Sequence, residues 1–244
     1  MISFKTTTCR VFCIAGCLYL LAAHPPLAKS ETLRTFVSDF QREFVNRGQK
    51  ETISGRVFYD VNLKKLLIRV DQPLRQWMVL EGRETIIYYP DKKQAFRIKT
   101  QIEAVMPFFQ VFIGCVEEDF GLGRLGYAMA GYEKKGMSLT SNWTPPKNMA
   151  KNLGDVVLMY ESNRLVSAEY KTPKGAPASK GTFGRHIPFG GYFFPLEISI
   201  ESKYEGGSTT EKVAYVNPEF NGALPEDVRA FKLPPGVMVK DVEW

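Results

Sequence analysis

The sequence predicts a mainly β (α+β) domain of about eleven antiparallel strands with two or three helices. Apolar and polar residues alternate between Glu51 and Lys99, which is typical of strands with one buried face. Strand-like segments return between Tyr127 and Val242, separated by turn residues. Residues 31–46 and 107–116 have helical patterns instead. No linker or repeat divides residues 31–244, so we expect one domain there.

The first thirty residues have the pattern of a secretory signal peptide. Lys5 and Arg10 precede an uncharged apolar stretch, and Ala28-Lys29-Ser30 supplies a small-residue cleavage pattern. The apolar stretch is shorter than the roughly 20 residues of a membrane span. We therefore expect export, cleavage near Ser30 and a mature domain of residues 31–244. Loss of the signal lowers the formal net charge from +6 to +3, which gives no reason to expect nucleic acid as a partner.

A lipid anchor is the alternative for this segment. Ile14-Ala15-Gly16-Cys17 resembles a lipobox, the site at which a lipoprotein precursor is cut and acylated on cysteine. Cys17 lies in the middle of the apolar stretch rather than at its end, which favours simple cleavage. Only Cys115 remains in the mature chain, so we expect no internal disulfide.

Two helices are expected at defined places. Leu33, Phe36, Val37, Phe40 and Phe44 recur at helical spacing, which predicts an amphipathic helix over residues 31–46. Residues 107–116 are apolar on almost every side and too short to cross a bilayer. We expect a helix buried on all sides, which either packs permanently in the core or acts as a movable lid that cargo displaces. The lid residues would be Phe109, Phe112 and Ile113, and the hinge would be Gly114, Gly121, Gly123 and Gly126.

A Gly- and Pro-rich stretch, residues 172–191, predicts a long loop. In and beside it, no acidic residue accompanies the basic ones, which are Lys171, Lys174, Lys180 and Arg185. This charge run predicts contact with an acidic partner or an anionic surface; a solvated loop is the alternative.

Catalytic chemistry is not expected. The mature chain has one histidine, His186, which excludes a multi-histidine metal site and leaves no nucleophile–base pair. Gly121 to Gly126 fits G-x-G-x-x-G but lacks the strand before it and the helix after it that a dinucleotide site needs. We therefore expect neither a cofactor nor a metal, and no enzyme.

An ordered set of short motifs resembles the LolA-like family of outer-membrane lipoprotein carriers. Phe40-Gln41, Gly55 and Gln72-Pro73 match the family's first elements. Glu81-Gly82-Arg83, followed by residues 86–90, is similar to the family's D-G-K…W-x-Y-x-P pattern, and residues 231–239 are similar to F-x-x-P-P-x-G-V-x-V. The clear match covers residues 33–100 and 229–241.

The resemblance implies an unclosed antiparallel β-barrel with a helical lid over a concave apolar face. It implies a monomeric periplasmic carrier of acylated lipoproteins, supplied by an inner-membrane transporter and emptied by an outer-membrane receptor. Position by position, the lipid-binding cavity would be lined by Leu66, Ile68, Val70, Trp77 and Val79. The family's Arg-Pro pair in the second strand, which helps to latch the lid, is replaced here by Asp60-Val61-Asn62. Two alternatives stay open: a periplasmic sensor or interaction domain with the same fold, and an outer-membrane receptor anchored through Cys17.

Overall fold

The computed structural model describes residues 31–99, 114 and 119–243. Within them the chain forms fourteen strands, two 3-10 turns (η) and one short α-helix. In chain order these are β1 (Thr35–Asn46), β2 (Gln49–Asp60), β3 (Lys65–Gln72), β4 (Gln76–Glu81), β5 (Glu84–Tyr89), η1 (Pro90–Lys92), β6 (Gln94–Lys99), η2 (Gly123–Leu125), β7 (Ala128–Lys135), β8 (Ser138–Thr144), β9 (Val156–Glu161), β10 (Arg164–Lys171), β11 (Pro177–Phe189), β12 (Tyr192–Tyr204), β13 (Gly207–Phe220), α2 (Glu226–Arg229) and β14 (Met238–Glu243).

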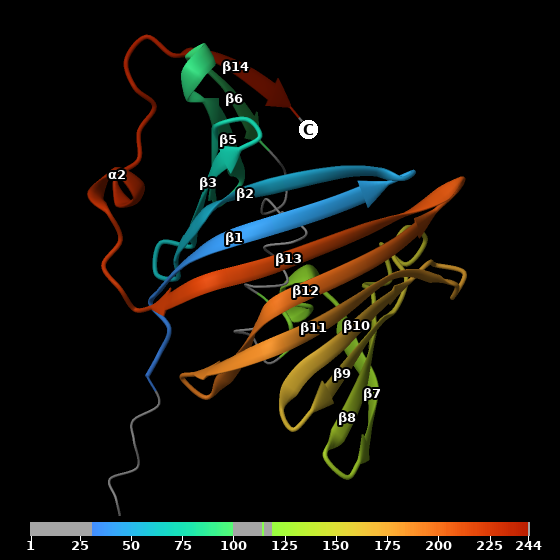
Figure 1. The fold of residues 1–244 in the computed structure, drawn as a ribbon. Helices are drawn as coiled ribbons and strands as arrows, with labels where there is room; N and C mark the ends of the chain where they lie inside the picture. The colour runs from blue at the N-terminus through green and yellow to red at the C-terminus, as the bar shows by residue number, and fades with distance from the viewer. Residues whose placement is uncertain (1–30, 100–113, 115–118, 244) are drawn as a thin grey trace, which may run out of the picture. The chain divides into compact units, whose positions relative to one another are not determined.

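All fourteen strands belong to one sheet, in the order β14-β6-β5-β4-β3-β2-β1-β13-β12-β11-β10-β9-β8-β7. Most neighbours are joined by short turns, as expected for antiparallel strands. The long strands β1, β13 and β12 lie side by side (Figure 1). β14 pairs with β6 in parallel, and the end strands β14 and β7 do not pair with each other. The prediction of a mainly β, unclosed fold is confirmed, with three strands more than the expected eleven.

The sheet has an apolar cluster on each face. The larger cluster unites side chains of β1–β4 with side chains of β8–β13, and we call the face that carries it the core face. The smaller cluster, on the outer face, unites Val37, Phe58, Leu67 and Val79 with Val228 of α2. Because strands near both ends of the sheet share the larger cluster, the sheet curves around its core face.

The expected N-terminal helix is wrong: residues 35–46 form strand β1, paired with β2 and β13 along its length. Phe36, Phe40 and Phe44 are four residues apart, a spacing that keeps side chains on one side of a helix and also on one face of a strand. Phe36 and Phe40 are 0% and 1% exposed. The conformation of residues 35–46 is therefore determined by pairing with two neighbouring strands rather than by local periodicity.

The expected loop over residues 172–191 is also wrong, because Pro177–Phe189 form strand β11 between β10 and β12. Two turns remain in this stretch: Gly190 and Gly191 before β12, and residues 172–176, where the amide of Gly175 donates to the carbonyl of Thr172 at 2.8 Å. Gly181 lies in this strand where a Cβ atom would come within 3.1 Å of the Phe183 ring. Gly181 thus serves close packing inside a strand rather than a loop.

The lid helix expected at residues 107–116 lies outside the described residues apart from Gly114, which is helical and buried. The expected lid residues Phe109, Phe112 and Ile113 lie outside them too. Among the residues that are described, no helix is long and apolar enough to cross a membrane.

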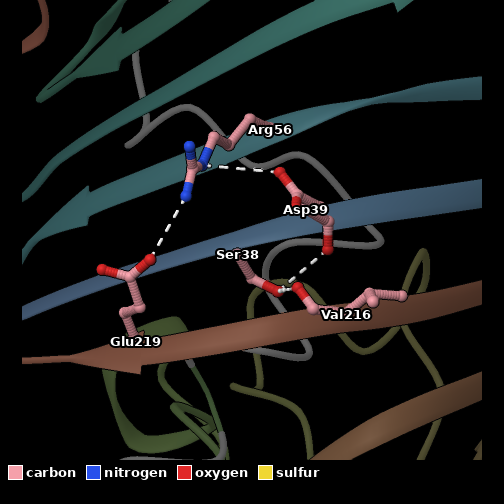
Figure 2. A network of polar contacts seen from close by, with 5 residues as sticks. All are labelled: Ser38, Asp39, Arg56, Val216 and Glu219. Atoms are coloured by element: carbon pink, nitrogen blue, oxygen red, sulfur yellow. Dashed lines mark hydrogen bonds and ion pairs between the residues drawn. The ribbon is translucent and has the colours of Figure 1, made fainter.

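A polar network pins a bulge between β1 and β13 (Figure 2). The buried hydroxyl of Ser38 lies 2.8 Å from the carbonyl oxygens of both Asp39 and Val216. On the outer face, Arg56 pairs with Asp39 at 3.4 Å and with Glu219 at 3.3 Å. These ion pairs are largely exposed and contribute little stability individually. The extra residue of the bulge lies in β13, and it lets Tyr215 and Phe220, which are five residues apart, both face the core cluster.

Candidate functional site

Three of the predicted site residues lie together on the core face of β3. Leu66, Ile68 and Val70 are 3%, 0% and 2% exposed. Ile68 stands opposite Val57 of β2 and Met78 of β4, so apolar side chains continue across the strands. All three side chains are therefore packed against other protein atoms.

Trp77 and Val79 lie on the opposite face, so the five predicted residues do not line one cavity. Val79 stands opposite Leu67, and both belong to the outer cluster, against which Trp77 packs. The sequence shows apolar residues on both faces of β4, but it does not say which face continues Leu66, Ile68 and Val70. The register of β3 and β4 places Met78 and Leu80 there instead.

The outer cluster is covered by a C-terminal strap, which we define as residues 224–237. Leu224, Val228 and Phe231 of the strap pack on this face, and the Phe231 and Trp77 ring centroids are 5.3 Å apart. The Arg69 guanidinium lies over the Trp77 ring at 5.6 Å and 3.9 Å from Asp227 of α2. The strap therefore accounts for the second apolar face of β4 without a ligand.

The far half of the core face, at β10 and β11, is covered by the turn of residues 119–127. Leu122 and Tyr127 of this turn belong to the core cluster. Phe120 packs beside Phe183 of β11, with ring centroids 5.9 Å apart. Sequence reasoning treated the glycines of this turn only as a hinge and missed its apolar side chains.

An ion pair stands on the core face where the apolar surface meets the ends of the long strands. Arg42 of β1 pairs with Glu211 of β13, and their side chains are 17% and 13% exposed. Arg42 stands opposite Val213, and its guanidinium lies 5.1 Å from the Phe44 ring centroid. A helix over residues 31–46 would not pair Arg42 with a neighbouring strand, so sequence reasoning missed this ion pair.

A hollow of about 460 Å³ crosses β2, β1, β13, β12 and β11. Apart from Arg42, its charged and hydroxyl- or amide-bearing lining residues alternate with the core-face residues Val213 and Ile198, which places them on the outer face: Gln41, Glu43, Thr52, Thr182, Glu197, Ser199 and Lys212. Lys50 and Lys212 hold the pKa of the Glu43 carboxyl below its ordinary value. The hollow does not coincide with the predicted lipid-binding residues.

The predicted basic contact residues do not form a loop. Lys180 lies in β11, in register between Glu169 of β10 and Glu201 of β12. Arg185 pairs with Glu197 at 3.2 Å. Acidic residues of other strands thus lie beside two of the four cations. Lys171 ends β10, and Lys174 lies in the turn of residues 172–176.

His186, expected on a surface loop, is half-buried in β11. Its Nε2 atom lies 2.8 Å from the carbonyl oxygen of Leu165. Burial lowers the pKa of the imidazole. Among residues 31–99, 114 and 119–243, no cluster of three or more His, Cys, Asp or Glu side chains could hold a metal ion.

No family model matches the chain. No curated protein matches it either.

Solved structures do match. A protein described as an outer membrane lipoprotein-sorting protein domain, from Vibrio parahaemolyticus, is 18% identical with a TM-score of 0.60, covering 83% of this chain and 92% of its own. A LolA superfamily protein from Nitrosomonas europaea is 14% identical with a TM-score of 0.56, covering 81% and 91%. A DUF1329 family protein from Desulfovibrio piger is 16% identical with a TM-score of 0.57, covering 81% and 90%. At these identities the likeness concerns the fold, and the predicted resemblance is confirmed at that level: the chain has the LolA-like fold.

Proposed function

We propose that this protein is a periplasmic carrier that binds the acyl chains of lipoproteins against its core face and moves them towards the outer membrane. The observation that carries the proposal is the continuous apolar surface that β3 shares with strands of the other half of an unclosed sheet. Such a surface suits a long acyl chain, since each methylene removed from water contributes about 0.8 kcal/mol. The LolA-like fold supports the same reading.

The buried state of Leu66, Ile68 and Val70 sets a condition on this function. Acyl chains reach these side chains only by displacing what covers them. Ten buried methylenes contribute about 8 kcal/mol before that cost is subtracted. A cost of a few kcal/mol still leaves binding favourable and also makes release feasible, which a carrier requires.

Two adjacent residues of β3 provide a matched test. Ile68 lies on the core face and Leu67 on the outer face, and they are 0% and 1% exposed. Both Ile68→Ala and Leu67→Ala should lower the free energy of unfolding by about 2–5 kcal/mol. Only Ile68→Ala should also weaken binding of an acylated peptide, by about tenfold, because it removes contacts with the chain.

The measurement is calorimetric titration of both variants with the same acylated peptide. Equal affinities for the two variants would place the acyl chain elsewhere and would leave Ile68 as ordinary core.

The proposed cellular setting includes export by residues 1–30, transfer from an inner-membrane transporter and delivery to an outer-membrane receptor. Mass spectrometry of protein purified from its own host distinguishes the candidate functions. Co-purifying acylated protein supports the carrier, whereas an acyl group on Cys17 supports the anchored receptor. Bare protein that starts at Glu31 favours the sensor or interaction domain.

Lys171, Lys174, Lys180 and Arg185 remain the proposed contacts with an acidic partner or surface. Replacing all four with Gln should slow delivery most at low ionic strength, where screening is weak. An unchanged delivery rate at every salt concentration would mean that these four residues form an ordinary solvated surface.

A further inference from the structure

The turn of residues 119–127, which we call the Asp119 turn, is fixed by its own hydrogen bonds. The Asp119 carboxylate accepts hydrogen bonds from the amides of Gly121 and Gly123, both at 2.9 Å. Four backbone hydrogen bonds of 3.0–3.1 Å close the rest of the turn. Gly121 and Gly126 have φ of 74° and 80°, which glycine adopts without strain. These glycines therefore build a closed turn, and a hinge would require the turn to break.

The turn is also tied to strand β10. The Tyr127 hydroxyl donates to the carbonyl oxygen of Gly154 at 3.1 Å, and the Gly154 amide donates to the Tyr170 hydroxyl at 3.2 Å. A Cβ atom on Gly154 would lie 2.0 Å from the carbonyl oxygen of Lys171, so the two backbones are in direct contact. Displacing the turn would leave the buried Tyr127 hydroxyl without this acceptor, which costs more than the bond itself contributes.

The Asp119 turn presents two apolar side chains to the core face. Leu122 is 6% exposed within the core cluster, and Phe120 packs beside Phe183 of β11. The proposed acyl-binding residues of β3 contribute to the same cluster from the other half of the sheet. An acyl chain that extends along the core face from β3 towards β11 would therefore meet these two side chains.

We infer that the Asp119 turn is the fixed end wall of the acyl site, and that Leu122 and Phe120 set the longest chain the protein accepts. The inference rests on the proposed carrier function and adds a chain-length specificity to it. Up to the length that reaches the wall, each added methylene raises the affinity about fourfold. Longer chains gain nothing further, because the surplus methylenes must fold back or remain in water.

Shortening the wall tests the inference. Leu122→Ala removes three carbon atoms, so the length of the best-bound chain should increase by about two to three carbons. The probe is a synthetic peptide with one saturated acyl chain, lengthened in two-carbon steps, and the readout is its dissociation constant. Leu33→Ala is the matched control, since Leu33 is also 6% exposed in the same cluster but precedes β1. It should lower thermal stability and leave the preferred length unchanged.

Phe120→Leu provides a second variant that removes less buried volume, in case Leu122→Ala does not fold. It should shift the preferred length in the same direction. If the wild-type protein binds the peptides but both wall variants retain its preferred length, the end wall is refuted while the carrier function stands. If the wild-type protein binds none of the peptides, the carrier function fails and the end wall with it.

Discussion

Gly55 shows how one missing side chain can be required by the core face. It lies in β2 between Phe40 of β1 and Val70 of β3. A Cβ atom there would lie 2.0 Å from the carbonyl oxygen of Arg69, a backbone atom that cannot move without shifting β3. We therefore expect Gly55→Ala to lower the free energy of unfolding by about 1–3 kcal/mol, as overpacking does.

Chemical denaturation measures this effect, and Gly131→Ala is its control. Gly131 lies in the end strand β7, where nothing approaches an added Cβ within 4 Å. Its substitution should change stability by no more than about 0.5 kcal/mol in either direction. Equal losses in the two variants would contradict the steric explanation and indicate a general effect of side chains on these strands.

Ionisation of the Tyr127 hydroxyl, which ties the Asp119 turn to its neighbours, should lower the stability of the folded protein at alkaline pH. Burial, the largest cause, raises the pKa of its hydroxyl from about 10 to about 12. A folded-state pKa above the unfolded one contributes stability that is complete below pH 10 and is lost as the pH rises through 12. The stability difference between the wild-type protein and Tyr127→Phe should thus be largest below pH 10 and shrink above it.

Unfolding free energies measured between pH 8 and pH 12 check this expectation. Other groups that titrate at high pH are present in both proteins, and their contributions cancel in the difference. A difference that stays constant over the range would mean that the hydroxyl titrates alike in the folded and unfolded chains.

At the scale of elements, β1 and β11 show where sequence reasoning succeeds and where it stops. Strands β2–β10 and β12–β14 were predicted because alternation and turn residues are local signals. β1 has a four-residue apolar spacing that fits a helix equally well, and β11 contains glycines and prolines that indicate a loop. Both are strands because each lies between two neighbouring strands that pair with its backbone.

The candidate site was predictable only in part, for a related reason. Alternation correctly grouped Leu66, Ile68 and Val70 within one strand. Grouping them with Trp77 and Val79 required the register between β3 and β4, and a shift of one residue exchanges the two faces. Likewise, the acidic neighbours of Lys180 and Arg185 come from other strands and cannot be inferred from the local charge run.

The strap is an element whose stability depends on a few apolar contacts. Val228 is the one buried residue of α2, at 3% exposed, and packs with Phe58 and Leu67. Val228→Ala should lower the free energy of unfolding by about 1–2 kcal/mol, because it removes the equivalent of two methylenes from a buried site. In contrast, Val216→Ala in β13, where the side chain is 42% exposed, should change it by less than about 0.5 kcal/mol. Thermal unfolding of both variants decides whether the strap is packed or only rests on the sheet.

At the scale of the whole molecule, the C-terminal segment protects the sheet in two separate ways. The strap covers the outer apolar cluster, while β14 pairs with the edge of β6. Exposed apolar patches and unpaired strand edges both promote self-association. Two truncations separate their contributions: a chain that ends at Val237 lacks only β14, and a chain that ends at Ala223 lacks the strap as well.

We expect both truncated chains to fold, because β1–β13 and the core cluster remain, but to differ in how they associate. The chain ending at Val237 should stay largely monomeric, since its newly exposed edge strand, β6, is only six residues long and carries Arg97 and Lys99. The chain ending at Ala223 should bind an apolar dye and form dimers or larger species, because Val37, Phe58, Leu67 and Val79 lose their cover. Sedimentation velocity at several concentrations measures the association. If the two chains associate equally, the open edge rather than the apolar face is what the C-terminal segment protects.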